Sequence, residues 1–208
     1  MPRKIFSKNK EHFKKAKNIF LQNNGFLRTS QALKLGIPPG TLYAMRDAGL
    51  IVQENRGIFR LEELQLTGNQ DLVLVAMLIP KAVICLISAL DFHELTTQIP
   101  HRVYITLPME VKRPRLEYPH LEVIWRTEVP YNSGIEQHVL DGVPVRIYNR
   151  EKTIADCLRY ENRVGRDVVL EALKEYRRQK PVNVEALMQY ARVNKVAQRM
   201  QAYLEILL

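Results

Sequence analysis

The side chains best suited to chemistry lie on a short polar face between residues 40 and 47, and their types are those that contact bases, sugars and phosphates. Arg46 can donate to a guanine edge or a phosphate, Thr41 can contact a phosphate or a thymine methyl group, and Tyr43 can contact a phosphate or sugar. Basic and small polar residues nearby could add phosphate contacts. The predicted DNA-binding residues are Lys14, Lys17, Arg28, Thr29, Ser30, Pro39, Thr41, Tyr43, Arg46, Asn55 and Arg56.

The segment from Gly25 to Arg60 must supply the elements that hold this face. A helix begins at Thr29, a turn at residues 36–39 leads into a second helix over Gly40 to Ala48, and two apolar runs flank a turn at residues 54–57. Helix, tight turn, helix and hairpin are the layout of a winged helix-turn-helix, whose second helix enters a DNA major groove. Some proteins with this layout bind only other proteins, which leaves a second interpretation open.

Helical periodicity predicts how these helices pack. Leu42, Met45 and Ala48 fall on one side of the second helix, and we expect them to pack on the helices before it. A preceding helix is predicted over Glu11 to Gln22, with residues 1–10 frayed or extended as an arm.

Charge is concentrated in the first third of the chain. The 208 residues carry a net charge of +9; residues 1–70 hold 12 Lys and Arg against 5 Asp and Glu, and the remaining 138 hold 19 against 17. A basic segment beside a nearly neutral one is typical of a nucleic-acid-binding module joined to a domain with another role. The alternative is a lysine-rich tail that aids solubility.

The length allows one large or two small domains, and the pattern predicts an α+β fold. We expect a winged helix-turn-helix domain at residues 1–66, and at residues 67–208 a mixed α/β domain with a small sheet and a helical C-terminus. The elements predicted for the second domain are helices near 70–79 and 83–93, strands at 102–107 and 121–126, a hairpin over 136–148, and helices near 150–160, 165–178, 183–191 and 194–207.

Several classes of protein are disfavoured by the composition. Cys85 and Cys157 resemble buried core residues of a reducing compartment, and the five histidines lack the spacing of a metal site. The most apolar stretch, residues 72–90, is interrupted by Pro80 and Lys81, so no membrane span is predicted. We therefore expect a cytoplasmic protein without metal or cofactor.

The sequence contains none of the common catalytic motifs, and we do not expect an enzyme. Ser88 and His93 are five positions apart on a predicted helix, which places them on different sides of it. A metal site combining Glu94 with His93 and His101 would need an unforeseen fold. The basic segment Lys112–Arg115 could be a second nucleic-acid contact, or simply a solvated loop.

Motifs in both halves resemble the AbiEi-type antitoxin family. The resemblance spans about residues 10 to 180, and the Glu151–Asp156 segment is its most specific part. The motifs are Asn24–Ala32, Leu35–Ile37, Leu42 with Tyr43, Ala48–Ile51, Arg56–Arg60, Ser88–Leu90 with His93–Thr96, Val103–Pro108 and Val145–Asp156.

The resemblance implies a transcriptional repressor that is the antitoxin of a type IV toxin–antitoxin, or abortive infection, system. The first domain would bind inverted repeats in double-stranded promoter DNA and repress its own operon. The second would counteract a nucleotidyltransferase-like toxin, without a stable complex. Two alternatives remain: a stand-alone regulator with no toxin, and an enzyme that modifies the toxin.

Glu151, Lys152, Thr153 and Asp156 form the predicted antitoxin motif, and the residues around them favour a helix. Asn149 is a suitable N-cap, and a carboxylate in the first turn is favourable near the positive end of the helix dipole. We expect Asp156 to pair with a neighbouring arginine, Arg159 or Arg163. The alternative to a neutralising role is that the motif only fixes this helix against the hairpin.

Overall fold

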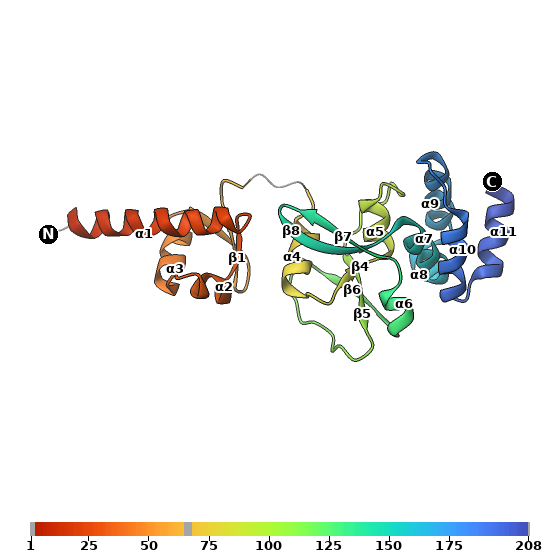
Figure 1. Cartoon of the computed structure of the whole chain (residues 1–208), viewed down its shortest axis with the longest axis horizontal. Coiled ribbons are helices and arrows are strands. Elements are labelled where there is room, and N and C mark those ends of the chain that lie inside the picture. Colours follow the sequence, from red (N-terminus) through yellow and green to blue (C-terminus); the bar gives the residue numbers. More distant parts are fainter. Residues whose placement is uncertain (1–2, 65–67, 208) are drawn as a thin grey trace. The chain divides into compact units, whose positions relative to one another are not determined.

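The structure, a computed structural model, describes residues 3–64 and 68–207 (Figure 1). The domain boundary predicted between residues 66 and 67 lies outside the described residues. The chain divides into two compact units: unit 1, Met1–Gln70 with Leu140–Val143, and unit 2, Asp71–Val139 with Pro144–Leu208. The two units together form a mixed α and β fold, as predicted at the level of fold class.

Unit 1 consists of three helices and a three-stranded antiparallel sheet of order β1-β3-β2. In Figure 1, α2 and α3 lie on the same side of α1. In chain order the elements are α1 (Arg3–Gln22), β1 (Phe26–Arg28), α2 (Thr29–Lys34), α3 (Pro39–Asp47), β2 (Ile51–Asn55) and β3 (Ile58–Leu61).

Apolar residues at helical and strand spacing form the core of unit 1. Phe20 of α1, Leu42 and Met45 of α3, and Phe59 of β3 are each at most 2% exposed and belong to one cluster. Burying side chains of this size stabilises a fold by about 1.5–3 kcal/mol each. The same packing orients α3, because the face of α3 opposite Leu42 and Met45 must be left to solvent.

Two expectations for unit 1 were wrong in detail. The helix predicted from Glu11 begins at Arg3, because no proline or glycine interrupts the good helix formers before it. Ala48 does not join the core: it is exposed and caps α3, since the helix ends at Asp47. Strand β1 was not predicted, because its three residues are too few to show a period of two.

Unit 2 is built on a five-stranded mixed sheet of order β6-β5-β4-β8-β7. The central strand β4 is antiparallel to β5 and parallel to β8. The first elements are α4 (Gln70–Leu78), β4 (Val83–Ile84), α5 (Leu86–Phe92), β5 (Val103–Pro108), β6 (Leu121–Arg126), α6 (Glu128–Asn132), β7 (Ile135–Leu140) and β8 (Val143–Tyr148).

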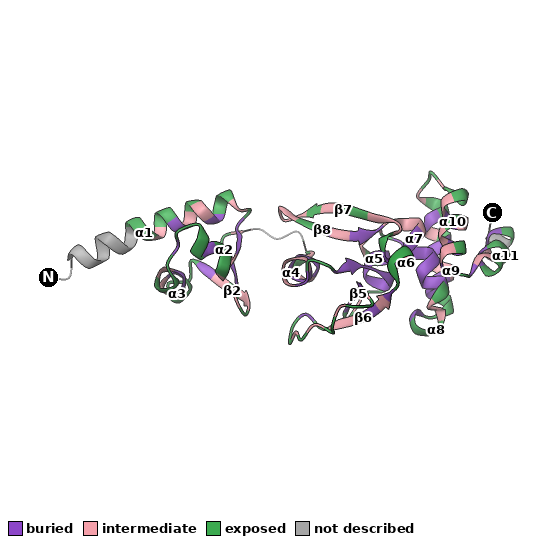
Figure 2. Cartoon of the chain, turned by 60° about the horizontal axis from the view of Figure 1, so that its bottom comes forward, coloured by how far each residue is buried: buried purple, intermediate pink, exposed green. Residues whose placement is uncertain are grey.

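Five helices complete unit 2 and gather at one end of its sheet (Figure 1). They are α7 (Arg150–Arg159), α8 (Glu161–Val164), α9 (Arg166–Arg178), α10 (Val184–Val193) and α11 (Ala197–Leu207). Helix α7 lies at the centre of the core, and its residues from Lys152 to Leu158 are all buried (Figure 2). Because α7 is central, its polar side chains Lys152, Thr153 and Asp156 are buried as well as its apolar ones.

Unit 2 differs from the predicted elements in two respects. The helix expected over residues 83–93 is divided, because Val83 and Ile84 form the short central strand β4 and α5 starts only at Leu86. Two short helices, α6 and α8, lie in stretches for which no element was predicted. No helix in the described ranges is long and apolar enough to cross a membrane.

Candidate nucleic-acid interface

Helix α3 presents a polar face whose direction is set by its buried side. Pro38 is the N-cap and Pro39 the first helical residue, where the missing N–H and fixed φ of proline cost nothing. Leu42 and Met45 are buried, while Tyr43 is 48% exposed. Thr41 is half-buried beside them. The side chains predicted to contact DNA from this helix are therefore accessible.

Arg46 is held in place by its neighbours and not free in solvent. Its Nε and Nη2 atoms donate to Asp47 Oδ1 at 3.0 and 2.8 Å, and Nη1 donates to Gln53 Oε1 at 3.4 Å. The guanidinium carbon lies 5.1 Å from the centre of the Tyr43 ring. Such an exposed ion pair contributes little to stability, so a phosphate or a guanine edge can take the place of the Asp47 carboxylate.

The tip of the β2–β3 hairpin lies against the start of α2. The backbone N–H of Thr29 donates to Gly57 O at 2.8 Å, and Gly57 has a φ of +78°, which favours glycine. Arg56 is exposed beside this contact, and Ser30 is exposed in the first turn of α2. Three predicted residues from distant parts of the segment are thus brought together.

The predicted lysines of α1 lie on different sides of that helix. Lys17 is half-buried and pairs with Glu63, its Nζ 2.6 Å from Oε2, which links α1 to the end of unit 1. Lys14 is exposed. In helical projection neither shares the side of α1 that faces α3, because that side carries residues 12, 15 and 19.

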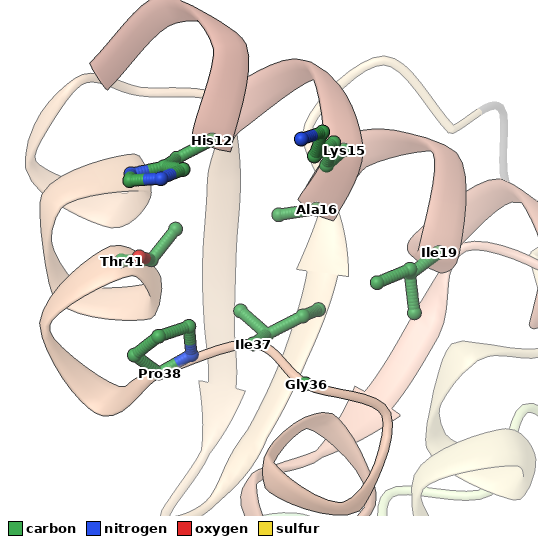
Figure 3. Close-up of a pocket in the computed structure, with 8 residues that line it drawn as sticks. All are labelled: His12, Lys15, Ala16, Ile19, Gly36, Ile37, Pro38 and Thr41. Carbon is green, nitrogen blue, oxygen red and sulfur yellow. The ribbon is translucent and has the colours of Figure 1, made fainter. Parts of the chain in front are cut away.

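A small pocket of about 150 Å³ shows which α1 residues do lie beside α3. His12 and Lys15 line it from α1, and Pro38 and Thr41 line it from the start of α3. Figure 3 shows His12 directed toward Thr41. Neither His12 nor Lys15 was among the predicted residues, although their spacing of i, i+3 with Ile19 at i+7 was a usable signal.

The remaining predicted side chains occupy the edges of this face. Arg28 is half-buried, and its backbone N–H donates to Gln31 Oε1 at 3.1 Å. Asn55 is half-buried, and its Oδ1 accepts from the backbone N–H of Arg56 at 2.6 Å. These bonds fix the local backbone. They involve the backbone N–H groups of Arg28 and Arg56 and not the guanidinium groups.

In unit 2 the predicted antitoxin motif forms a buried polar network. Lys152 Nζ lies 2.5 Å from Asp156 Oδ2, and Asn194 Nδ2 donates to Asp156 Oδ1 at 2.8 Å. Arg126 Nη2 donates to Asn194 Oδ1 at 2.5 Å. Burial lowers the pKa of Lys152, and the adjacent Asp156 carboxylate counteracts that effect. The network joins α7 to β6 and to the end of α10.

The partners expected for Asp156 were wrong. Arg159 donates to the backbone carbonyl of Asn194 at 2.7 Å, and Arg163 lies 3.7 Å from Glu122. Asp156 instead meets Lys152, one turn earlier on its own helix, and Arg126 at 3.9 Å. The sequence could not identify Arg126 as the partner, because Arg126 belongs to β6. Which strand packs beside α7 cannot be read from distances along the chain.

The other two motif residues also have defined partners. Glu151 Oε1 accepts from the hydroxyl of Tyr176 at 2.5 Å, and Glu151 is half-buried. The Thr153 hydroxyl donates to Tyr148 O at 3.2 Å and is fully buried. Of the four motif side chains, only Glu151 is partly accessible.

The imagined nucleophile–base pair is not assembled. The Ser88 hydroxyl donates to Arg102 O at 3.3 Å and accepts from the N–H of Tyr104 at 3.0 Å, while His93 Nε2 lies 2.7 Å from Tyr148 O. Burial lowers the pKa of His93 and is partly offset by that hydrogen bond. Within residues 3–64 and 68–207, no group of three or more His, Cys, Asp or Glu could hold a metal ion.

Comparison with known proteins supports the motif-based resemblance. Residues 14–62 match the family described as transcriptional regulator, AbiEi antitoxin. These residues include α2, α3 and the hairpin, so the predicted family resemblance is confirmed over the segment that carries the polar face. Over it the chain is similar to a toxin–antitoxin regulator.

The fold of the whole chain has a counterpart among solved structures. It resembles the RV2827C protein from Mycobacterium tuberculosis with a TM-score of 0.58 and 12% sequence identity, over 92% of this chain and 81% of that chain. At that identity the likeness concerns the fold alone. No curated protein matches the chain significantly.

Proposed function

We propose that this protein is a transcriptional repressor that binds inverted repeats in double-stranded promoter DNA, and that it is the antitoxin of a type IV toxin–antitoxin system. The observation that carries the proposal is an overlap. The family match at residues 14–62 covers the exposed face of α3 and the hairpin tip beside α2.

In this proposal unit 1 is a winged helix-turn-helix, corresponding to the domain proposed at residues 1–66. Helix α3 would enter the major groove with Tyr43 and Arg46, and the wing formed by β2 and β3 would bring Arg56 to the adjacent minor groove. Thr29 and Ser30 would contact the phosphates between them. The order of elements and the exposure of these side chains support this docking.

Mobility-shift assays with the promoter DNA of this gene test the DNA proposal. We expect Arg46→Ala and Arg56→Ala each to weaken binding by about 1–3 kcal/mol, since each removes a charged donor to a base edge or phosphate. Arg166→Ala is a matched control, because it removes the same charge from an exposed residue of unit 2. Wild-type affinity in both unit 1 variants would refute the proposed face.

Salt dependence provides an independent measurement. If five basic residues (Lys14, Lys17, Arg28, Arg46 and Arg56) neutralise phosphates, the log–log slope should be about −4 to −5. Arg56→Ala should reduce its magnitude by about 1. A slope near zero would contradict DNA binding through this surface.

The antitoxin part concerns unit 2, the C-terminal domain proposed at residues 67–208. We propose that it counteracts a nucleotidyltransferase-like toxin without a stable complex. Lys152, Thr153 and Asp156 would contribute by holding α7 in place, because all three are buried. Glu151, half-buried at the start of α7, is the motif residue that could reach a partner.

Co-expression with the gene downstream tests this part. Rescue of growth from a nucleotidyltransferase-like product supports an antitoxin, and the absence of any toxic neighbour supports a stand-alone regulator. Mass spectrometry of the toxin after incubation with this protein separates the third possibility. A mass change on the toxin would show an enzyme, and rescue without one would exclude covalent modification.

A further inference from the structure

Unit 2 contains a cationic pocket that the proposed function does not use. It has a volume of about 310 Å³ and lies between the start of β5 and the loop before β6. Arg102, Arg113 and His120 line it, with Leu116 and Leu121. Volumes of about 300–1,000 Å³ are typical of small-molecule sites, so the pocket is large enough for a ligand.

The polar side chains of this pocket have few hydrogen-bond or ion-pair partners within the part of the protein that the structure describes. Arg102 Nη1 lies 3.7 Å from Glu122 Oε2, and the other oxygen of that carboxylate is 3.7 Å from Arg163, so Glu122 is shared between two arginines at long distance. Arg113 and His120 have no side-chain hydrogen bond or ion pair within the described ranges. Guanidinium groups with unused N–H donors are the preferred protein ligands of phosphate.

Two hydrogen bonds to backbone carbonyls hold the loop that carries Arg113. At its start, Trp125 Nε1 donates to Val111 O at 2.9 Å. At its end, the N–H of Val103 donates to His120 O at 2.8 Å. Both ends of the loop are therefore fixed to neighbouring strands. A ligand would bind a preformed site, and little entropy would be lost in ordering the loop.

A second, more apolar pocket of about 570 Å³ adjoins the first through Arg102, which lines both. Ile99 lines it with 79% of its surface exposed, together with Pro100 and the half-buried Tyr104. Thr97, at its rim, is fixed by Glu171 through hydrogen bonds of 2.9 and 2.7 Å. A large apolar side chain this exposed, in a pocket that shares Arg102 with a cationic pocket, suits a ligand with both a ring and an anion.

We infer that the two pockets form one binding site for a mononucleotide. Its phosphate would lie between Arg102 and Arg113, and its base and sugar would cover Ile99, Pro100 and Tyr104. Arg102 would contact both halves, since a guanidinium plane can stack on a ring while its edge donates to phosphate. The inference does not depend on DNA binding by unit 1 or on a toxin.

Isothermal titration of the full-length protein with adenosine monophosphate is the direct test. We expect saturable binding, with adenosine and inorganic phosphate each at least about ten-fold weaker because each fills half of the site. Arg113→Gln should weaken binding of the nucleotide at least about ten-fold. Ile99→Ser should weaken the nucleotide and adenosine, but leave phosphate unchanged.

Lys112→Gln is the matched control, because Lys112 precedes Arg113 in the same loop, is exposed and does not line the pocket. It should leave nucleotide affinity within about two-fold of wild type, as loss of one exposed charge is a small effect. Equal losses in the two loop variants, or no saturable binding of the nucleotide, would overturn the inference. So would binding of a single-stranded oligonucleotide that the mononucleotide cannot displace. Promoter binding should be unchanged in Arg113→Gln, which separates this outcome from the proposed function.

Discussion

Buried charged residues form a network between α7 and its neighbours. Lys152 is fully buried, and Asp156 and Arg126 are 3% and 7% exposed. Removing such charges from water is costly, and only close partners repay that cost. Here the partners are present: Asp156 accepts from Lys152 and Asn194, and Asn194 accepts from Arg126. Removing one charge of the Lys152–Asp156 pair should therefore lower the free energy of unfolding more than removing both charges does.

We predict that Asp156→Ala destabilises the protein by about 3–5 kcal/mol, because it leaves Lys152 charged and unpaired in the core. The double variant Lys152→Met with Asp156→Asn should recover part of this loss, since no charge of the pair then remains buried. Urea unfolding followed by circular dichroism measures both. A cost below about 1 kcal/mol for Asp156→Ala would show that the pair is not tightly coupled.

At the scale of the elements, the turn between α6 and β7 approaches α7 closely, and a glycine permits that contact. Gly134 has a φ of +73°, and a Cβ atom built on it would lie 2.7 Å from Lys152 Cβ and 3.2 Å from the Tyr190 ring. The carbonyl of Gly134 also accepts from the N–H of Asn149, the N-cap of α7, at 2.8 Å. This turn therefore determines where α7 begins.

Gly134→Ala should destabilise unit 2 by more than 2 kcal/mol, on the order of an overpacked core position with added backbone strain. Gly36→Ala is the matched control: Gly36 also has a positive φ of +86°, but nothing lies within 4 Å of its Cβ position. It should cost only about 1–2 kcal/mol from strain. Equal effects in chemical denaturation would mean that the close contact with α7 relaxes freely.

At the scale of the whole molecule, each unit has a hydrophobic core of its own. The core of unit 1 includes Phe20 and Phe59, and that of unit 2 includes Tyr148, Tyr176 and Leu187. Separate cores favour separate unfolding, since cooperativity follows contiguous packing. A ligand that binds one unit then stabilises that unit.

We predict two calorimetric transitions, of which only one responds to promoter DNA. At a DNA concentration of about 100 times Kd, the responding unit should gain about 2.7 kcal/mol. Asp156→Ala should lower the other transition, because its network lies in unit 2, and should leave the DNA-dependent shift intact. A single transition that moves as a whole with DNA would contradict independent unfolding.

Much of the fold was predictable because local patterns are strong here. The second helix of the predicted helix-turn-helix was expected over Gly40–Ala48 and is α3, Pro39–Asp47, since prolines mark its start and Gly49 its end. The hairpin expected over residues 136–148 is formed by β7 and β8, because Asp141–Gly142 between them is a strong turn signal. Strands of two or three residues, such as β4 and β1, were missed because they are too short to show a period.

The sequence by itself determined which side chains of α3 are exposed, because a helix with Leu42 and Met45 buried has only one face left for Tyr43 and Arg46. Only the tertiary structure decided the partners. Lys17 meets Glu63 across 46 residues, and Arg126 meets Asn194 across 68. It also placed His12 and Lys15, and not Lys14, beside the start of α3. Local periodicity predicts which side of its own helix a side chain occupies. The partner of that side chain depends on contacts between segments far apart in the sequence, which a local pattern does not predict.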